Sequence, residues 1–151
     1  DEAWELTAET LTYSRAVGES YRIARNLHQL AEIDLLRGRT AEALELLAES
    51  ISLNIEHGRR GDAALQMRLV AGIAGDTGDT LAAVRCAAFA DANANALITM
   101  LPDDRAAHAL RVEQWRASLA PEDWATAWAA GAAMDAAGAD ALISSLVTQV
   151  R

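Results

Sequence analysis

The feature that most constrains this chain is an internal repeat with a period of forty residues. The segment from Glu2 to Glu9 aligns with the segment from Glu42 to Glu49, and six of the eight aligned residues are identical. One period further along, the same shift aligns Gly38 with Gly78. A constant period of this length is typical of repeat proteins, in which each unit buries its apolar face against the next. The repeat therefore predicts a stack of similar units.

The apolar residues within each repeat are spaced as on an α-helix. Over residues 23–35 and 44–55 they recur every three or four positions, so each segment has one apolar face. Between the two segments, Gly38 suits the left-handed position after a helix, and Thr40 suits the N-cap of the next helix. No stretch alternates with a period of two, so the sequence predicts an all-α protein. About eight helices are expected, over residues 2–17, 20–37, 40–57, 62–76, 80–100, 103–119, 122–137 and 139–150.

Composition and charge exclude several classes of function. The chain has 151 residues and a net charge of −9, so we expect no direct binding of nucleic acid, because the protein would repel phosphate. All 13 cationic side chains are arginines, and a chain without lysine has neither a P-loop nor Schiff-base chemistry. The single cysteine, Cys86, cannot form an internal disulfide, and no apolar run reaches the ~18–20 residues of a membrane helix. We therefore expect a cytoplasmic protein that does not bind membranes.

Small residues occupy matching positions on both sides of each turn. In the first copy Ala31 precedes the glycine turn and Ala43 follows it, and Ala71 and Ala83 repeat this order in the second copy. Small side chains at these positions let two helices cross at about 8–10 Å. The pattern resembles the tetratricopeptide signature, although the period is forty rather than about 34 residues. This resemblance implies a TPR-like α-solenoid of antiparallel helix pairs.

The C-terminal part resembles one group of repeat proteins. The run from Ala127 to Met134, followed by a last helix, is similar to the ending of large bacterial signalling proteins. In those proteins an ATPase domain, often joined to a cyclase or a LuxR-type DNA-binding domain, precedes a long tetratricopeptide-like array. The resemblance implies that residues 1–151 are one helical-repeat domain taken from a longer bacterial protein. Its repeats would span residues 1–100, and capping helices would span residues 101–151.

No set of residues in the sequence points to catalysis. The three histidines, at positions 28, 57 and 108, lie far from one another and from the cysteine, so we expect no metal site. Cys86 lies among apolar neighbours and is predicted to be a buried, unreactive side chain. The carboxylates that follow the two prolines are expected to stabilise helix N-termini; they are Asp103, Asp104, Glu122 and Asp123. We therefore expect a non-enzymatic protein without a cofactor.

Three tryptophans in the C-terminal part have two interpretations. Trp124 and Trp128 are four residues apart and share a helix face, and Trp115 lies on the preceding helix. Such a set can form an aromatic cage for a cation. More often it closes the open end of a solenoid as a buried apolar plug. A fourth tryptophan, Trp4, aligns with Leu44 across the repeat and is expected in the core.

The resemblance to tetratricopeptide arrays also implies where a partner would bind. In such arrays the first helix of each pair lines the concave side. The register counted from Ala43 places five polar residues there: Arg25, His28, Glu32, Arg68 and Asp76. The three basic residues among them would form a cationic strip suited to an acidic or carboxylate-bearing peptide. The alternative is an ordinary solvated helix face.

The sequence leads to one preferred function and one alternative. We expect an interaction or regulatory scaffold of a bacterial signalling ATPase or transcriptional regulator, which binds a protein, a peptide or neighbouring domains. The alternative is a domain that senses a small-molecule effector, which a deep apolar pocket would favour. The first helix aligns with the second helix of a pair, so its face with Trp4, Leu6 and Leu11 is expected to lack a neighbour. That face predicts weak self-association through the N-terminal end.

Overall fold

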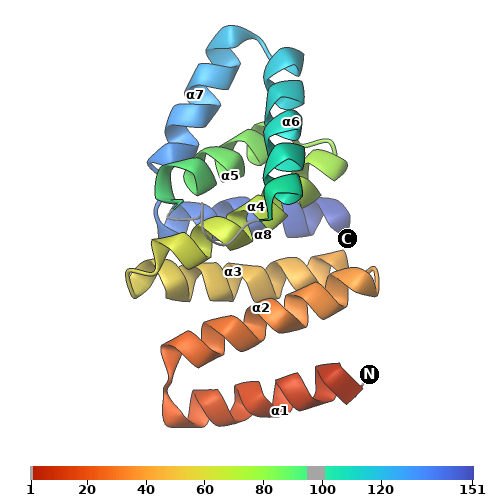
Figure 1. Ribbon diagram of the computed structural model, residues 1–151, viewed down its shortest axis with the longest axis vertical. Helices are drawn as coiled ribbons and strands as arrows, with labels where there is room; N and C mark the ends of the chain where they lie inside the picture. Colours follow the sequence, from red (N-terminus) through yellow and green to blue (C-terminus); the bar gives the residue numbers. More distant parts are fainter. Residues whose placement is uncertain (1, 95–100) are drawn as a thin grey trace. The chain divides into compact units, whose positions relative to one another are not determined.

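The computed structural model describes residues 2–94 and 101–151, and this part of the chain contains eight α-helices and no strand. The helices, labelled in Figure 1, are α1 (Glu2–Val17), α2 (Ser20–Leu36), α3 (Thr40–Glu56), α4 (Arg60–Asp76), α5 (Thr80–Asn93), α6 (Pro102–Ser118), α7 (Pro121–Ala132) and α8 (Ala136–Val150). The expected all-α fold is confirmed. None of the described helices is long and apolar enough to cross a membrane.

Four glycines end the first four helices at intervals of twenty residues. Gly18, Gly38, Gly58 and Gly78 all have a positive φ, between 73° and 87°, which costs glycine nothing because it has no Cβ. At each turn the glycine amide donates to the carbonyl three residues earlier, and the next amide donates to the carbonyl five residues before it. This pair of bonds is the Schellman motif, which satisfies the last carbonyl groups of a helix. The sequence prediction for Gly38 is therefore confirmed.

The helix starts after these turns differ in how they are capped. Thr40 was expected as an N-cap, but this prediction was wrong: Thr40 is the first residue of α3 and Arg39 is its N-cap, without a side-chain bond. Before α5, the Asp79 carboxylate accepts a 3.0 Å hydrogen bond from the Ala82 amide. In each Schellman turn the residue after the glycine, Arg39 or Asp79, is also the N-cap of the next helix. The threonine that follows it is therefore the first residue of that helix and not its cap.

The break between the last two helices also lies earlier than expected. The helix predicted over 122–137 ends at Ala132, and α8 begins after Asp135. The Asp135 carboxylate accepts a 2.8 Å hydrogen bond from the Gly138 amide, so Gly138 lies in the first turn of α8 rather than at a helix end. The helix predicted over 80–100 corresponds to α5, which ends at Asn93. Positions 95–100 of that prediction lie outside the described residues.

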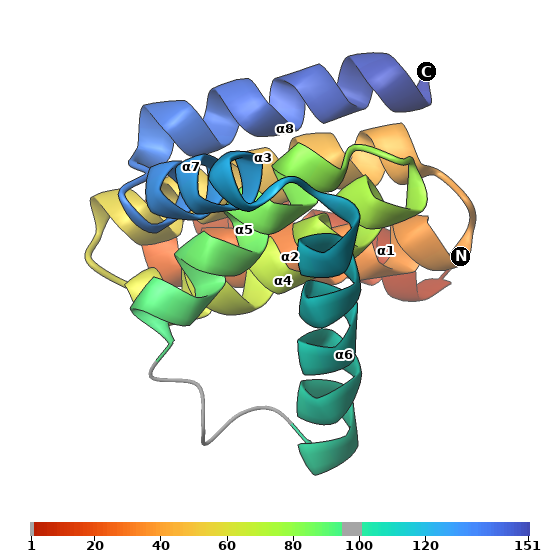
Figure 2. The same cartoon turned by 90° about the horizontal axis from the view of Figure 1, so that it is seen from above.

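The chain divides into two compact units. Unit 1 contains α1, α2, α3 and α8, and unit 2 contains α4, α5, α6 and α7. In unit 1, α2 packs between α1 and α3 (Figure 1), and α8 runs along α3, as Figure 2 shows. In unit 2, α5 packs against α4 and α7, with α6 beside it. The expected division into repeats over 1–100 and capping helices over 101–151 stays a prediction.

Alanines and glycines allow close helix packing in both units. Ala31 and Ala43 in unit 1, and Ala71 and Ala83 in unit 2, are fully buried. The closest approach is at Gly131 in α7, where an added Cβ would lie 2.2 Å from the carbonyl oxygen of Arg85 in α5. Carbon atoms in ordinary contact lie about 3.5–4.0 Å apart, so only glycine fits at this position.

Buried polar groups in unit 1 connect neighbouring helices. Asn26 Nδ2 donates to Ser14 Oγ at 3.2 Å, which joins α2 to α1. Ser50 Oγ donates to the Ala24 carbonyl oxygen at 2.7 Å, which joins α3 to α2. At the end of α2, the buried Asp34 carboxylate accepts from the Arg39 guanidinium. Each bond compensates for removing a polar group from water and so fixes how the helices are aligned.

Candidate functional site

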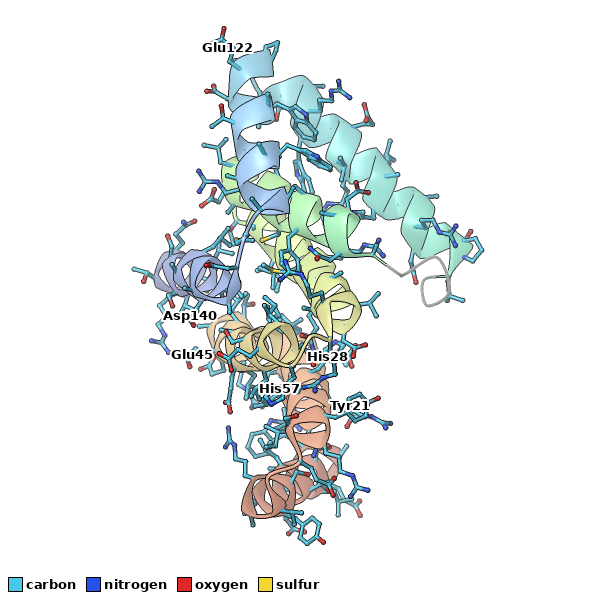
Figure 3. The ribbon with its side chains drawn as sticks, turned by 90° about the vertical axis from the view of Figure 1, so that its left-hand side faces the viewer. Tyr21, His28, Glu45, His57, Glu122 and Asp140 are labelled. Carbon is cyan, nitrogen blue, oxygen red and sulfur yellow. The ribbon has the colours of Figure 1, made fainter. Side chains whose placement is uncertain are left out.

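Three of the five predicted groove residues lie on α2 in unit 1. Arg25 and Glu32 are exposed, and His28 is half-buried. His28 Nε2 lies 3.7 Å from a Glu32 carboxylate oxygen, one helix turn away. Figure 3 shows His28 at the same edge of the unit as Tyr21, opposite the edge that carries Glu45 and Asp140. Arg25 and His28 therefore lie on an accessible part of unit 1.

The other two predicted residues lie on α4 in unit 2, where α6 contacts the same helix face. Asp76 forms a 2.8 Å ion pair with Arg111 of α6, and Arg111 also donates to the Gly72 carbonyl oxygen at 3.2 Å. Arg68 is half-buried; burial lowers its pKa, and the nearby Asp91 carboxylate acts in the opposite direction. The five residues thus lie on two separately described units, and their joint role in binding a partner stays a prediction.

A cationic hollow lies between α1 and α2. It has a volume of about 400 Å³ and is lined by Leu6, Thr7, Thr10, Arg22, Arg25, Asn26 and Gln29. We call it the α1–α2 groove. Its charged side chains are two arginines, so it is a place where an otherwise acidic protein presents positive charge. Arg25 and the exposed Leu6 were expected from the sequence, whereas Thr7 and Thr10 were not, because Leu6 was grouped with Trp4 and Leu11 on one face of α1.

That open face of α1 is not the one expected. Leu11 is buried with Leu27 and Leu30, and Trp4 packs against this cluster, so the prediction that Trp4 and Leu11 lack a neighbour was wrong. Leu6 is 56% exposed. Successive residues of a helix are separated by about 100°, which places Leu6 on the side opposite Trp4 and Leu11. The spacing of these residues in the sequence therefore already indicates that Leu6 lies on a different face of α1 from Trp4 and Leu11. Self-association stays a prediction.

A second hollow, of about 470 Å³, lies in unit 2. Its walls come from α4, α5, α6 and α7 and consist of Arg68, Ala87, Asp91, Ala94, Arg105, His108, Ala109, Val112, Glu113 and Trp128. The hollow is thus lined by basic and acidic side chains and by one aromatic side chain, that of Trp128. Burial lowers the pKa of His108, and the Arg68 charge lowers it further, so this imidazole resists protonation. Sequence reasoning missed this set because four helices contribute to it.

Acidic residues gather between α3 and α8 in unit 1. Glu45 and Asp140 lie on the same edge of unit 1 (Figure 3), and both line a hollow of about 470 Å³. Arg151 pairs with Glu45 at 2.5 Å, and Arg15 bonds both carboxylate oxygens of Glu49 at 2.7 Å. All these side chains are substantially exposed, so the pairs contribute little to stability. We regard this region as a solvated surface.

The tryptophans of unit 2 have different environments. Trp115 is buried against Gly75 of α4, which agrees with a core role. The rings of Trp124 and Trp128 are stacked with centroids 5.0 Å apart, and both are half-buried. The guanidinium of Arg116 lies 5.7 Å from the Trp124 ring centroid, so a cation of the protein itself occupies the face where a cage would hold a ligand.

The remaining candidate side chains have structural surroundings. Cys86 is fully buried, and burial raises its pKa to about 12, so the thiol stays protonated and unreactive. His57 is the C-cap residue of α3, and its Nδ1 lies 2.9 Å from the Leu53 carbonyl oxygen. The four carboxylates after the prolines lie in the first turns of α6 and α7, as expected. In the described part of the chain, no three His, Cys, Asp or Glu side chains are grouped to hold a metal ion.

Comparisons of the chain with protein-family models, with characterised proteins and with solved structures found no match.

Proposed function

We propose that the chain is a non-enzymatic helical-repeat scaffold that binds an acidic segment of a partner protein. The observation that carries this proposal is the series of four Schellman turns at residues 18, 38, 58 and 78. One turn geometry recurring every twenty residues supports a repeating unit of two helices and forty residues. In a solenoid of such units each repeat contacts its neighbours, and the extended surface serves to bind partners.

The packing of small residues supports the same arrangement. The alanines that the forty-residue shift aligns, Ala31 with Ala71 and Ala43 with Ala83, are all fully buried. Equivalent positions therefore have equivalent environments in the two copies. This supports a TPR-like stacking of helix pairs, with one copy represented in each unit.

The charge distribution supports an acidic partner. On a chain of net charge −9, Arg25 gives the α1–α2 groove a local positive charge, because Arg22 beside it is paired with Glu19. Arg25 at this groove is exposed and available for a charge-assisted hydrogen bond to a carboxylate.

The biological setting belongs to the same proposal. The similarity of residues 127–134 to the ending of bacterial signalling ATPases and transcriptional regulators supports a regulatory segment of such a protein. The bound acidic segment would then come from a partner or from another domain of the same regulator.

A panel of labelled acidic peptides, with basic peptides of equal length, tests the proposal by fluorescence anisotropy. We expect acidic peptides to bind more tightly and to lose affinity as salt rises from 50 to 300 mM, because screening shortens the range of the attraction. Arg25→Ala and Arg68→Ala are assayed singly and together, with Arg116→Ala as the matched control. Equal binding of acidic and basic peptides, or unchanged affinity in the double variant, contradicts the proposal.

The hollow of unit 2 favours one other function, the sensing of a small effector. Its volume of about 470 Å³ lies within the range of small-molecule sites, about 300–1,000 Å³, and Arg68, Asp91 and His108 converge on it beside Trp128. A thermal-shift screen of small polar metabolites tests this candidate. A ligand that raises the melting temperature of the parent chain but not of Trp128→Ala supports sensing; no stabilising ligand, or one that stabilises both equally, opposes it.

A further inference from the structure

A stripe of exposed side chains runs along one face of α1. Leu6, Thr10, Tyr13 and Val17 are spaced by four, three and four residues, which places them within about 60° of one another around the helix. Leu6, Tyr13 and Val17 are 56%, 62% and 51% exposed, and Thr10 is also exposed. We call these four residues the α1 stripe. A continuous surface of this kind, mostly apolar, marks a site of interaction.

The equivalent face of α3 shows what covers such a stripe within the same chain. The forty-residue repeat, on which this inference rests as part of the proposed function, aligns the α1 stripe with Leu46, Ser50, Leu53 and His57. Leu46 and Leu53 pack against the cluster that contains Leu27 and Leu30 of α2, and Ser50 donates its hydrogen bond to Ala24 of α2. An α-helix therefore covers this face of α3, whereas the α1 stripe is exposed.

Charged residues border the α1 stripe on both sides. On the side of α2 lie Arg22 and Arg25, which line the α1–α2 groove together with Leu6 and Thr10. Arg22 is already paired with Glu19 at 2.7 Å, whereas Arg25 forms no ion pair within the described part of the chain. On the other side Glu9 is about 60° from Leu6 around the helix. A covering helix therefore needs carboxylates on the edge facing α2 and none on the other edge.

We infer that the α1 stripe and Arg25 bind an amphipathic helix of a partner protein, with one acidic edge. Its contact face carries small and apolar residues spaced as Ala24, Leu27 and Ala31 are in α2, because that pattern fits the equivalent face of α3. Its carboxylates lie against Arg25, where charge-assisted hydrogen bonds fix its orientation. A second copy of this chain fits less well, because two chains of net charge −9 repel and Tyr13 prevents the close crossing that alanine permits.

The probe for this groove is a synthetic helix of seventeen residues with alanine, leucine and alanine at positions i, i+3 and i+7 and glutamates along one edge. A matched probe has lysine in place of every glutamate. Both are titrated into the ¹⁵N-labelled chain, and amide shifts report where binding occurs. We expect the acidic probe to shift residues 6–17 and 22–29 and the lysine probe to bind at least tenfold more weakly.

Variants assign the binding to the groove. Leu6→Gln combined with Tyr13→Ser should weaken the acidic probe at least tenfold, and Arg25→Glu at least fivefold. These side chains are exposed, so the variants should keep the parent circular dichroism spectrum. Leu110→Gln, which removes a leucine that is 61% exposed on α6, is the matched control and should leave the affinity unchanged.

The other outcomes each overturn the inference in a recognisable way. Shifts that map to Glu32 and Arg68 instead of α1 disprove the groove but leave the proposed function intact. A dimer of the chain alone, removed by the Leu6 and Tyr13 changes, assigns the stripe to a second copy. No binding of the acidic probe disproves the groove, and the peptide panel with Arg68→Ala then decides the proposed function separately.

Discussion

Replacing Gly131 by alanine tests the close contact between α7 and α5. The new Cβ would lie 2.2 Å from the Arg85 carbonyl oxygen and 2.6 Å from its Cα, at least about 1 Å closer than ordinary contact. Because the obstructing atoms are backbone, one helix must move. Such overpacking costs about 1–3 kcal/mol, and the better helix propensity of alanine returns at most about 1 kcal/mol. We expect a net loss of up to about 2 kcal/mol.

Gly72→Ala is the matched control for this change. It also replaces a helical glycine in unit 2, but its Cβ would lie 3.4 Å from the terminal nitrogen of Arg111, a flexible side chain that can move. This variant should be neutral or more stable by up to about 1 kcal/mol. The two variants should therefore differ by about 2 kcal/mol, or roughly 1 M in the urea midpoint. If urea unfolding followed by circular dichroism gives Gly131→Ala a midpoint equal to or above that of Gly72→Ala, the described contact is wrong.

Three further predictions concern single residues. Cys86, buried and with a pKa raised to about 12, should react with a thiol reagent at pH 8 at least a hundredfold more slowly in the native chain than in urea, and fast native labelling would disprove its burial. Burial lowers the pKa of His108, so the unfolded chain binds more protons there, and stability should fall as pH drops below about 6.5. Melting temperatures at pH 7.5 and 5.5 should differ less in His108→Gln than in the parent, with His57→Gln as the control. Gly58→Ala should cost about 1–2 kcal/mol in urea unfolding because alanine is strained at a φ of 73°, and an unchanged midpoint would contradict the turn geometry.

The helices were predictable from the sequence because their signals are local. Apolar spacing and the glycine at position 38 both act within one turn of chain, so the helix bounds before residue 94 are nearly correct. The break before α8 was expected at residue 138, whereas α7 ends at Ala132 and α8 begins at Ala136. Its actual cause, the Asp135 carboxylate bonded to the Gly138 amide, is also local and could have been recognised as an Asx cap.

The candidate binding surfaces were less predictable because they depend on packing between helices. The sequence identified Arg25 as a site for acidic partners, but it could not show that Leu6 and Thr10 of α1 line the same hollow. The ion pair of Asp76 with Arg111, thirty-five residues away, likewise depends on how α6 packs on α4. By contrast, the exposed position of Leu6 follows from helix geometry alone and was available from the sequence.

The most direct measurement of the proposed repeat is the folding of a chain in which residues 20–59 occur twice in tandem. These forty residues comprise α2, α3 and the two turns that follow them. If the unit is one repeat of a solenoid, the longer chain inserts another helix pair, keeps the parent ellipticity per residue at 222 nm and unfolds at an equal or higher urea concentration. A matched chain that duplicates residues 20–49 ends its extra segment within α3, breaks the period and should lose stability. Equal ellipticity and equal urea midpoints for the two duplicated chains would contradict the repeat. So would a forty-residue duplication that fails to fold.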